Sequence, residues 1–80
     1  MEVYPNPTSG AGYVAIDSEV EQSVRLLITD MQGRMVSDQT LALQSGLQTI
    51  ELQTAEWPAG LYLAHLVSAQ GHSSAKWMIE

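Results

Sequence analysis

Apolar residues alternate with polar or small residues in segment after segment of this chain, and a period of two is typical of half-buried β-strands. The clearest case is residues 23–30, SVRLLITD, in which Val24, Leu26 and Ile28 share one face of the predicted strand. We expect these three side chains to be buried. The same pattern predicts inward-facing residues in five further segments: Val14, Ile16, Leu41, Leu43, Ile50, Leu52, Tyr62, Ala64, Leu66, Ala75, Trp77 and Ile79.

Turn-forming residues separate the predicted strands. Residues 30–33, DMQG, begin with aspartate and end with glycine, which favours a type I turn that opens a hairpin. In WPAG, Pro58 suits the first central position of a turn, and Gly60 ends the turn before the next strand. Ser45–Gly46 and Gln70–Gly71 mark two more turns, the second with His72 in its loop. The pattern predicts an all-β sandwich of about seven short antiparallel strands and no helix.

The chain opens with VYPNPTSG, residues 3–10. Proline fixes its own φ and keeps the preceding residue extended, so Pro5 and Pro7 hold Tyr4 and Asn6 out of the helical region. We expect a short first strand at Val3 and Tyr4, ended by the prolines, followed by a bend at Gly10. The first and last strands are expected to be edges of the sandwich, where unpaired backbone groups are open to a partner.

Length and composition exclude several classes of protein. Eighty residues suit one domain, residues 1–80, and the absence of cysteine excludes disulfides, thiolate zinc sites and cysteine nucleophiles. A net charge of −6, from nine acidic and three basic residues, has the wrong sign for nucleic acid. No apolar run reaches the roughly 18 residues of a membrane span, and no signal peptide is visible. The start at Met1, directly before the ordered-looking opening, suggests a fragment of a larger protein.

No residue pattern indicates catalysis. His65 and His72 lack partner ligands, Ser9, Ser73 and Ser74 lack a GxSxG elbow, and Asp17 with Glu19 or Glu21 lacks an apolar pocket that would separate two pKa values. We therefore expect no enzyme, no cofactor, no metal and no small-molecule substrate. Sugar stacking on aromatic rings is the alternative, and its candidates are Tyr13, Trp57, Tyr62 and Trp77. Tyr62 and Trp77 are expected inward and Trp57 beside the core, which leaves Tyr13 facing outward.

Four motifs in order resemble one known family, the type A C-terminal sorting domain of the Bacteroidetes type IX secretion system. They are VYPNPTSG at the start, ITDMQGRMV in the centre, WPAGLYLAHL before the penultimate predicted strand and AKWMIE at the end. The resemblance covers nearly the whole chain and implies an immunoglobulin-like β-sandwich of seven strands. The residues that match the family's motifs are Tyr4, Pro5, Asn6, Pro7, Gly10, Asp30, Gly33, Arg34, Pro58, Gly60 and Tyr62. The closing strand, which the resemblance implies is recognised by the translocon, contributes Lys76, Trp77, Met78, Ile79 and Glu80.

The resemblance implies that the domain is a sorting signal and has no catalytic activity. Such a domain sits at the C-terminus of a cargo protein, passes through the periplasm and directs the cargo across the outer membrane to the cell surface or beyond. Its partners would be type IX translocon and shuttle components, with a sortase-like cysteine peptidase cutting upstream of the domain in many members. A monomer is expected, and edge strands leave a strand-exchanged dimer open. The alternatives are a carbohydrate-binding or fibronectin-like accessory module, and a structural spacer.

Overall fold

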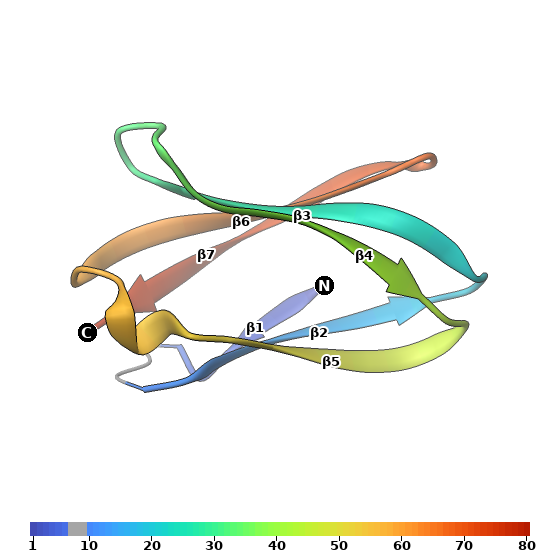
Figure 1. Cartoon of the computed structure of the whole chain (residues 1–80), viewed down its shortest axis with the longest axis horizontal. Helices are drawn as coiled ribbons and strands as arrows, with labels where there is room; N and C mark the ends of the chain where they lie inside the picture. Colours follow the sequence, from blue (N-terminus) through green and yellow to red (C-terminus); the bar gives the residue numbers. More distant parts are fainter. Residues whose placement is uncertain (7–9) are drawn as a thin grey trace.

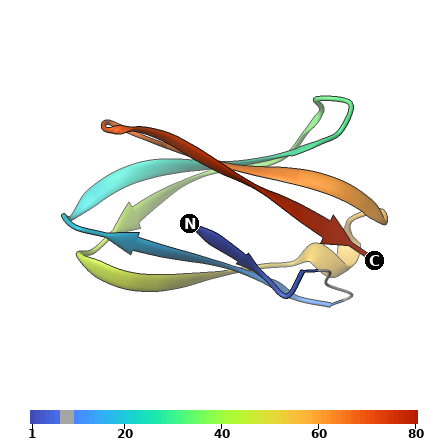
Figure 2. The same ribbon diagram turned by 180° about the vertical axis from the view of Figure 1, so that it is seen from behind.

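A computed structural model of the chain describes residues 1–6 and 10–80 and shows two antiparallel sheets that face each other (Figures 1 and 2). The strands are β1 (Glu2–Tyr4), β2 (Gly12–Ser18), β3 (Gln22–Asp30), β4 (Met35–Leu43), β5 (Gly46–Leu52), β6 (Gly60–Ser68) and β7 (Gly71–Ile79). One sheet has the order β1-β2-β5 and the other the order β4-β3-β6-β7. The prediction of a seven-stranded all-β sandwich is confirmed.

The core lies between the two sheets and is built from the inward-facing residues, at alternate positions along the strands. Val24, Leu26 and Ile28 of β3 are buried, as the alternation predicted. The other buried apolar residues are Val3, Val14, Ile16, Leu43, Leu52, Tyr62, Ala64, Trp77 and Ile79. The remaining residues that were expected inward are half-buried and pack against this cluster: Leu41, Ile50, Leu66 and Ala75. The period of two therefore located the core because each sheet has one covered face.

The turn between β3 and β4 forms as predicted. The Gly33 N–H donates to the Asp30 carbonyl oxygen at 3.0 Å, which is the closing bond of a four-residue turn. Gly33 has a φ of 85°, a conformation that glycine adopts at little cost. The pairing of β3 with β4 shifts register between Ile28 and Thr29, and such a bulge bends the strands. The tip of this hairpin rises away from the body of the sandwich (Figure 1).

Two other connections differ from the sequence prediction in detail. Residues 44 and 45 join β4 to β5, which lie in different sheets, so the Ser45–Gly46 signal marks a crossing between sheets. His72 was expected in a loop, and this was wrong: the turn after β6 is short, and His72 lies in β7 opposite Val67. Histidine carries no turn preference, so its position next to Gly71 was a weak guide.

A short 3-10 turn, Thr54–Glu56, connects β5 to β6 and is the one helical element among the described residues. The Thr54 side chain is buried, and its hydroxyl donates to the Gly10 carbonyl oxygen. The turn thereby ties the β5–β6 connection to the opening of the chain. No helix within residues 1–6 and 10–80 is long and apolar enough to cross a membrane.

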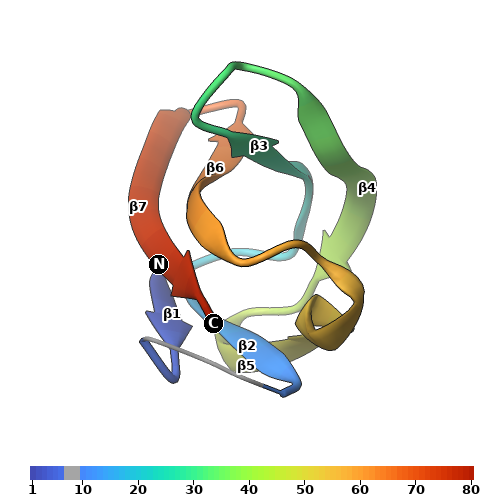
Figure 3. The same ribbon diagram turned by 90° about the vertical axis from the view of Figure 1, so that its left-hand side faces the viewer.

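The sheets end in four edge strands, and β1 and β7 are two of them, as expected for the first and last strands. β1 ends at Tyr4, and the peptide bond between Tyr4 and Pro5 is cis. Pro7 of the opening motif lies outside the described residues. In the end-on view, β1 and the C-terminal end of β7 lie close together on one side of the sandwich (Figure 3).

Candidate functional site

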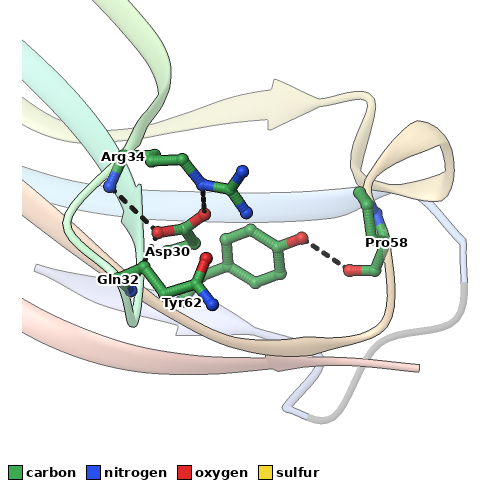
Figure 4. Close-up of polar contacts among 5 residues, drawn as sticks. All are labelled: Asp30, Gln32, Arg34, Pro58 and Tyr62. Atoms are coloured by element: carbon green, nitrogen blue, oxygen red, sulfur yellow. Dashed lines mark hydrogen bonds and ion pairs between the residues drawn. The ribbon is translucent and has the colours of Figure 1, made fainter.

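Two of the sequence motifs meet at one end of the four-stranded sheet. Asp30 ends β3 and Tyr62 lies near the start of β6, and the antiparallel pairing of these strands makes the two residues direct cross-strand partners. The β3–β4 turn and residues 58–62 are the two sides of an open groove of about 500 Å³. Asp30, Arg34, Pro58 and Tyr62 all line this groove (Figure 4). We call it the hairpin groove.

The Asp30 carboxylate organises the turn. Its Oδ1 accepts hydrogen bonds from the backbone N–H groups of Gln32 and Arg34, both at 2.9 Å, and its Oδ2 accepts one from Arg34 Nε at 2.9 Å. These bonds favour the ionised carboxylate, and the largest effect comes from the Arg34 backbone N–H. Together they hold the pKa of Asp30 below its ordinary value, against an opposing contribution from desolvation.

The turn is therefore expected to weaken in acid. A group whose pKa is lower in the folded state stabilises the fold fully above its unfolded pKa, and this contribution is lost as the pH falls through the folded pKa. For Asp30 the loss begins near the ordinary value of about 4 and continues below it. An NMR titration of the Asp30 carboxyl carbon, alongside thermal unfolding at several pH values, measures both effects. A midpoint at or above the ordinary value, or an Asp30→Asn variant with unchanged acid sensitivity, would contradict this assignment.

Arg34 presents its charge to the groove. Only its Nε is bonded to Asp30, and Figure 4 shows the two terminal nitrogens pointing away from that carboxylate. The side chain is 76% exposed despite the ion pair. Asp30 therefore orients the guanidinium while leaving its outer edge open, and that edge suits a carboxylate or another planar anion.

The opposite side of the groove is held by Tyr62. Its ring is buried, and its hydroxyl donates to the Pro58 carbonyl oxygen at 2.5 Å. A tyrosine near a strand start that bonds to backbone four residues upstream is the arrangement of the tyrosine corner of immunoglobulin-like sandwiches. Gly60, between the two, begins β6 and has a φ of 154°. The Trp57 ring packs against Tyr62 with a centroid distance of 5.4 Å, so the connection before β6 is fixed from both ends.

Exposed apolar side chains flank the groove, and sequence reasoning did not single them out. Met31 and Met35 are 58% and 53% exposed, and Val36 is also exposed, although each lies beside the turn. The available signal was the pair of methionines, Met31 within the turn and Met35 just after it, where solvent-facing polar residues are usual. Flexible methionine side chains adapt to varied partners and are common on binding surfaces.

The opening and closing motifs also meet. Asn6 Nδ2 donates to the Lys76 carbonyl oxygen at 3.1 Å, and the Met78 N–H donates to Asn6 Oδ1 at 3.0 Å. Trp77 Nε1 donates to the Pro5 carbonyl oxygen at 2.9 Å. Tyr4 lies on the outer face of the three-stranded sheet and stacks on Tyr13 at 5.5 Å. The opening motif therefore belongs to the folded domain, as expected for Val3 and Tyr4, and it fixes the end of β7.

The closing residues divide into two groups. Trp77 and Ile79 are buried, so their side chains hold the sandwich together. Lys76, Met78 and Glu80 are exposed and are the members of this segment whose side chains reach solvent. Gly10 of the opening motif is exposed at the bend before β2.

The histidines and the aromatic rings were the sequence candidates for metal binding and sugar stacking. No group of three or more His, Asp or Glu side chains within residues 1–6 and 10–80 is placed to hold a metal ion. His65 Nε2 lies 3.3 Å from Thr29 Oγ1, and His72 is exposed. Trp57 also contacts Trp77 edge-on at 6.2 Å. Of the four candidate sugar-stacking rings, Tyr62 and Trp77 therefore lie in the core and Trp57 packs against them.

Comparison with known families decides the identity. The family described as the secretion system C-terminal sorting domain matches residues 2–80. The chain belongs to this family. No curated protein and no solved structure matches the chain. It is thus a type IX sorting domain, a non-catalytic secretion signal for cargo proteins. Sorting domains interact with the secretion machinery and lead to secretion to the cell surface or the exterior.

Proposed function

We propose that the secretion machinery recognises this sorting domain at the hairpin groove, with Arg34 as the principal polar contact. The observation that carries the proposal is that two motifs well separated in the sequence, one containing Asp30 and Arg34 and the other Tyr62, converge on a single groove. The translocon and its shuttle components are the proposed partners. Lys76, Met78 and Glu80 provide a second exposed contact at the end of β7, while Trp77 and Ile79 keep that strand in place.

The charge distribution supports Arg34 in this role. The chain has three basic residues, and Arg25 is already paired with Asp38 at 2.7 Å on the sheet. Within its guanidinium group, Arg34 donates to Asp30 through Nε, and the two terminal nitrogens point away from that carboxylate. A carboxylate of the machinery that binds beside Met31 and Met35 would gain a charge-assisted bond and bury exposed apolar surface.

We infer that residues 1–80 act as one C-terminal domain of a larger cargo protein. The domain would travel as a monomer through the periplasm and reach the outer-membrane surface or the medium with its cargo. A sortase-like cysteine peptidase would then cut upstream of the domain. The contacts of the opening motif with β7 support a cleavage site upstream of the domain, because they keep this motif within the folded part of the chain.

Arg34→Gln is expected to reduce export of a fused reporter about tenfold, because a charge-assisted hydrogen bond is worth roughly 1.5–3 kcal/mol. The measurement compares reporter in the medium and at the cell surface with reporter in the periplasm of a type IX-competent host. Arg25→Gln is the matched control, since it removes an exposed arginine from the same sheet outside the groove. If both variants fold and are exported equally, the hairpin groove is not the surface that the secretion machinery recognises.

A further inference from the structure

Among the described residues no strand is hydrogen-bonded to the outer edge of β7, because β7 is the last strand of its sheet. In an antiparallel pair, the backbone groups of successive residues point alternately toward and away from the partner strand. The bonds from Asn6 show that Lys76 and Met78 point away from β6. By the same alternation, His72 and Ser74 also direct their backbone N–H and C=O groups outward.

The Asn6 amide occupies the C-terminal end of this edge as a neighbouring strand would. It donates to the Lys76 carbonyl oxygen and accepts from the Met78 N–H, which are groups of residues two apart on one strand. Asn6 itself is exposed, so water competes for both bonds. β1 lies along the C-terminal half of β7, while the half near Gly71 extends beyond it (Figures 2 and 3). Asn6 therefore protects one end of the edge and leaves the run from His72 to Ser74 open.

We propose that the outer edge of β7 docks an extended segment of the secretion machinery, and that Asn6 is a gate that this segment displaces. The proposal rests on the proposed function. The occupant is an extended polypeptide because the edge offers a row of N–H and C=O groups, to which an added strand is complementary. His72 and Ser74 have small or polar exposed side chains on this run, which suits pairing through the backbone. Docking would start at the open run and extend to Met78 as Asn6 is released.

Proline at an outward-facing position blocks such docking while sparing the fold. Ser74→Pro removes an N–H that points away from β6, and proline is tolerated on edge strands at positions of this kind. We expect Ser74→Pro to keep the near-ultraviolet circular dichroism of the tryptophans. The amount of exported reporter should fall about tenfold with Ser74→Pro and stay normal with Ser74→Ala. His72→Pro blocks the same edge nearer the turn and replaces Ser74→Pro if that variant does not fold.

The role of Asn6 as a gate can be measured in the isolated domain by hydrogen exchange. Asn6→Ala is expected to speed hydrogen exchange of the Met78 amide about tenfold and to leave the Trp77 amide, which faces β6, unchanged. Gln70→Ala, in the turn just before the start of β7, is the control. Normal export of a folded proline variant would overturn the proposal. A proline variant that loses self-association but is still exported would also overturn it, because the segment docked on β7 would then belong to a second copy of the domain. Failure of the unaltered domain to export the reporter would instead overturn the proposed function.

Discussion

Trp77→Ala is expected to lower the free energy of unfolding by about 3–5 kcal/mol, the usual cost of removing a buried aromatic side chain. The Trp77 side chain is fully buried, and it contacts Trp57 edge-on at 6.2 Å. Its Nε1 also donates to the Pro5 carbonyl oxygen, so the substitution removes one of the hydrogen bonds between β7 and the opening segment. Domains of this size have little stability to lose, and much of the population should be unfolded at 37 °C.

Chemical denaturation followed by far-ultraviolet circular dichroism measures this loss. Trp57→Ala is the control, because Trp57 is only partly buried and packs at the margin of the core. We expect it to cost clearly less than Trp77→Ala. If the two variants were equally stable, the core would not be organised around Trp77. Such a result would also contradict the role given to Trp77 in holding the closing strand against the opening motif.

Gly12→Ala is expected to cost about 1–3 kcal/mol or more, because it overfills a packed site. A Cβ at this position would lie 2.7 Å from Trp77 Cη2 and 2.9 Å from Thr54 Cγ2, and nearer still to Trp77 Cζ2. Both neighbours are buried, so neither can move aside freely. Glycine is required here for close packing of the indole on β2. The same denaturation experiment measures the effect.

Gly10→Ala is the matched control for this substitution. Gly10 lies two residues away, and no atom of the described residues lies within 4 Å of a Cβ built there. We expect its stability to stay within about 0.5 kcal/mol of the unaltered domain, as for most exposed substitutions. Equal destabilisation by the two substitutions would mean that contact with Trp77 does not explain the effect.

The strands and the core were predictable because the relevant information is local. Val24, Leu26 and Ile28 alternate with residues of the opposite face, and one covered face per sheet turns that alternation directly into burial. The turn at Asp30–Gly33 was predictable for the same reason, since its aspartate and glycine act within four residues. His72 was misplaced because a strand start has no comparably specific residue.

The sites depend on contacts that the sequence pattern does not specify. Asp30 and Tyr62 meet because β3 pairs with β6, and the order of strands in a sheet does not follow from alternation. Asn6 reaches Lys76 and Met78 across some 70 residues of sequence. The family resemblance identified the residues of both motifs, and the structure adds which of them are neighbours. Gly12 carried a usable signal, because glycine inside a strand often marks close approach by another group.

The opening segment is a structural part of the sorting domain in this account. Val3 is buried, Pro5 accepts the indole N–H of Trp77, and Asn6 holds the edge of β7. These contacts explain why a motif at one end of the chain and a motif at the other end occur together. Substitutions in either motif should therefore be judged by folding before they are judged by export.

Export of an attached reporter tests the central claim most directly. Residues 1–80, joined through an upstream linker to a periplasmic reporter, are introduced into a type IX-competent host, with a known sorting domain as the positive control. The account predicts that the reporter reaches the cell surface or the medium and that it stays in the periplasm when the translocon is inactivated. A folded fusion that remains in the periplasm while the control is exported would contradict it.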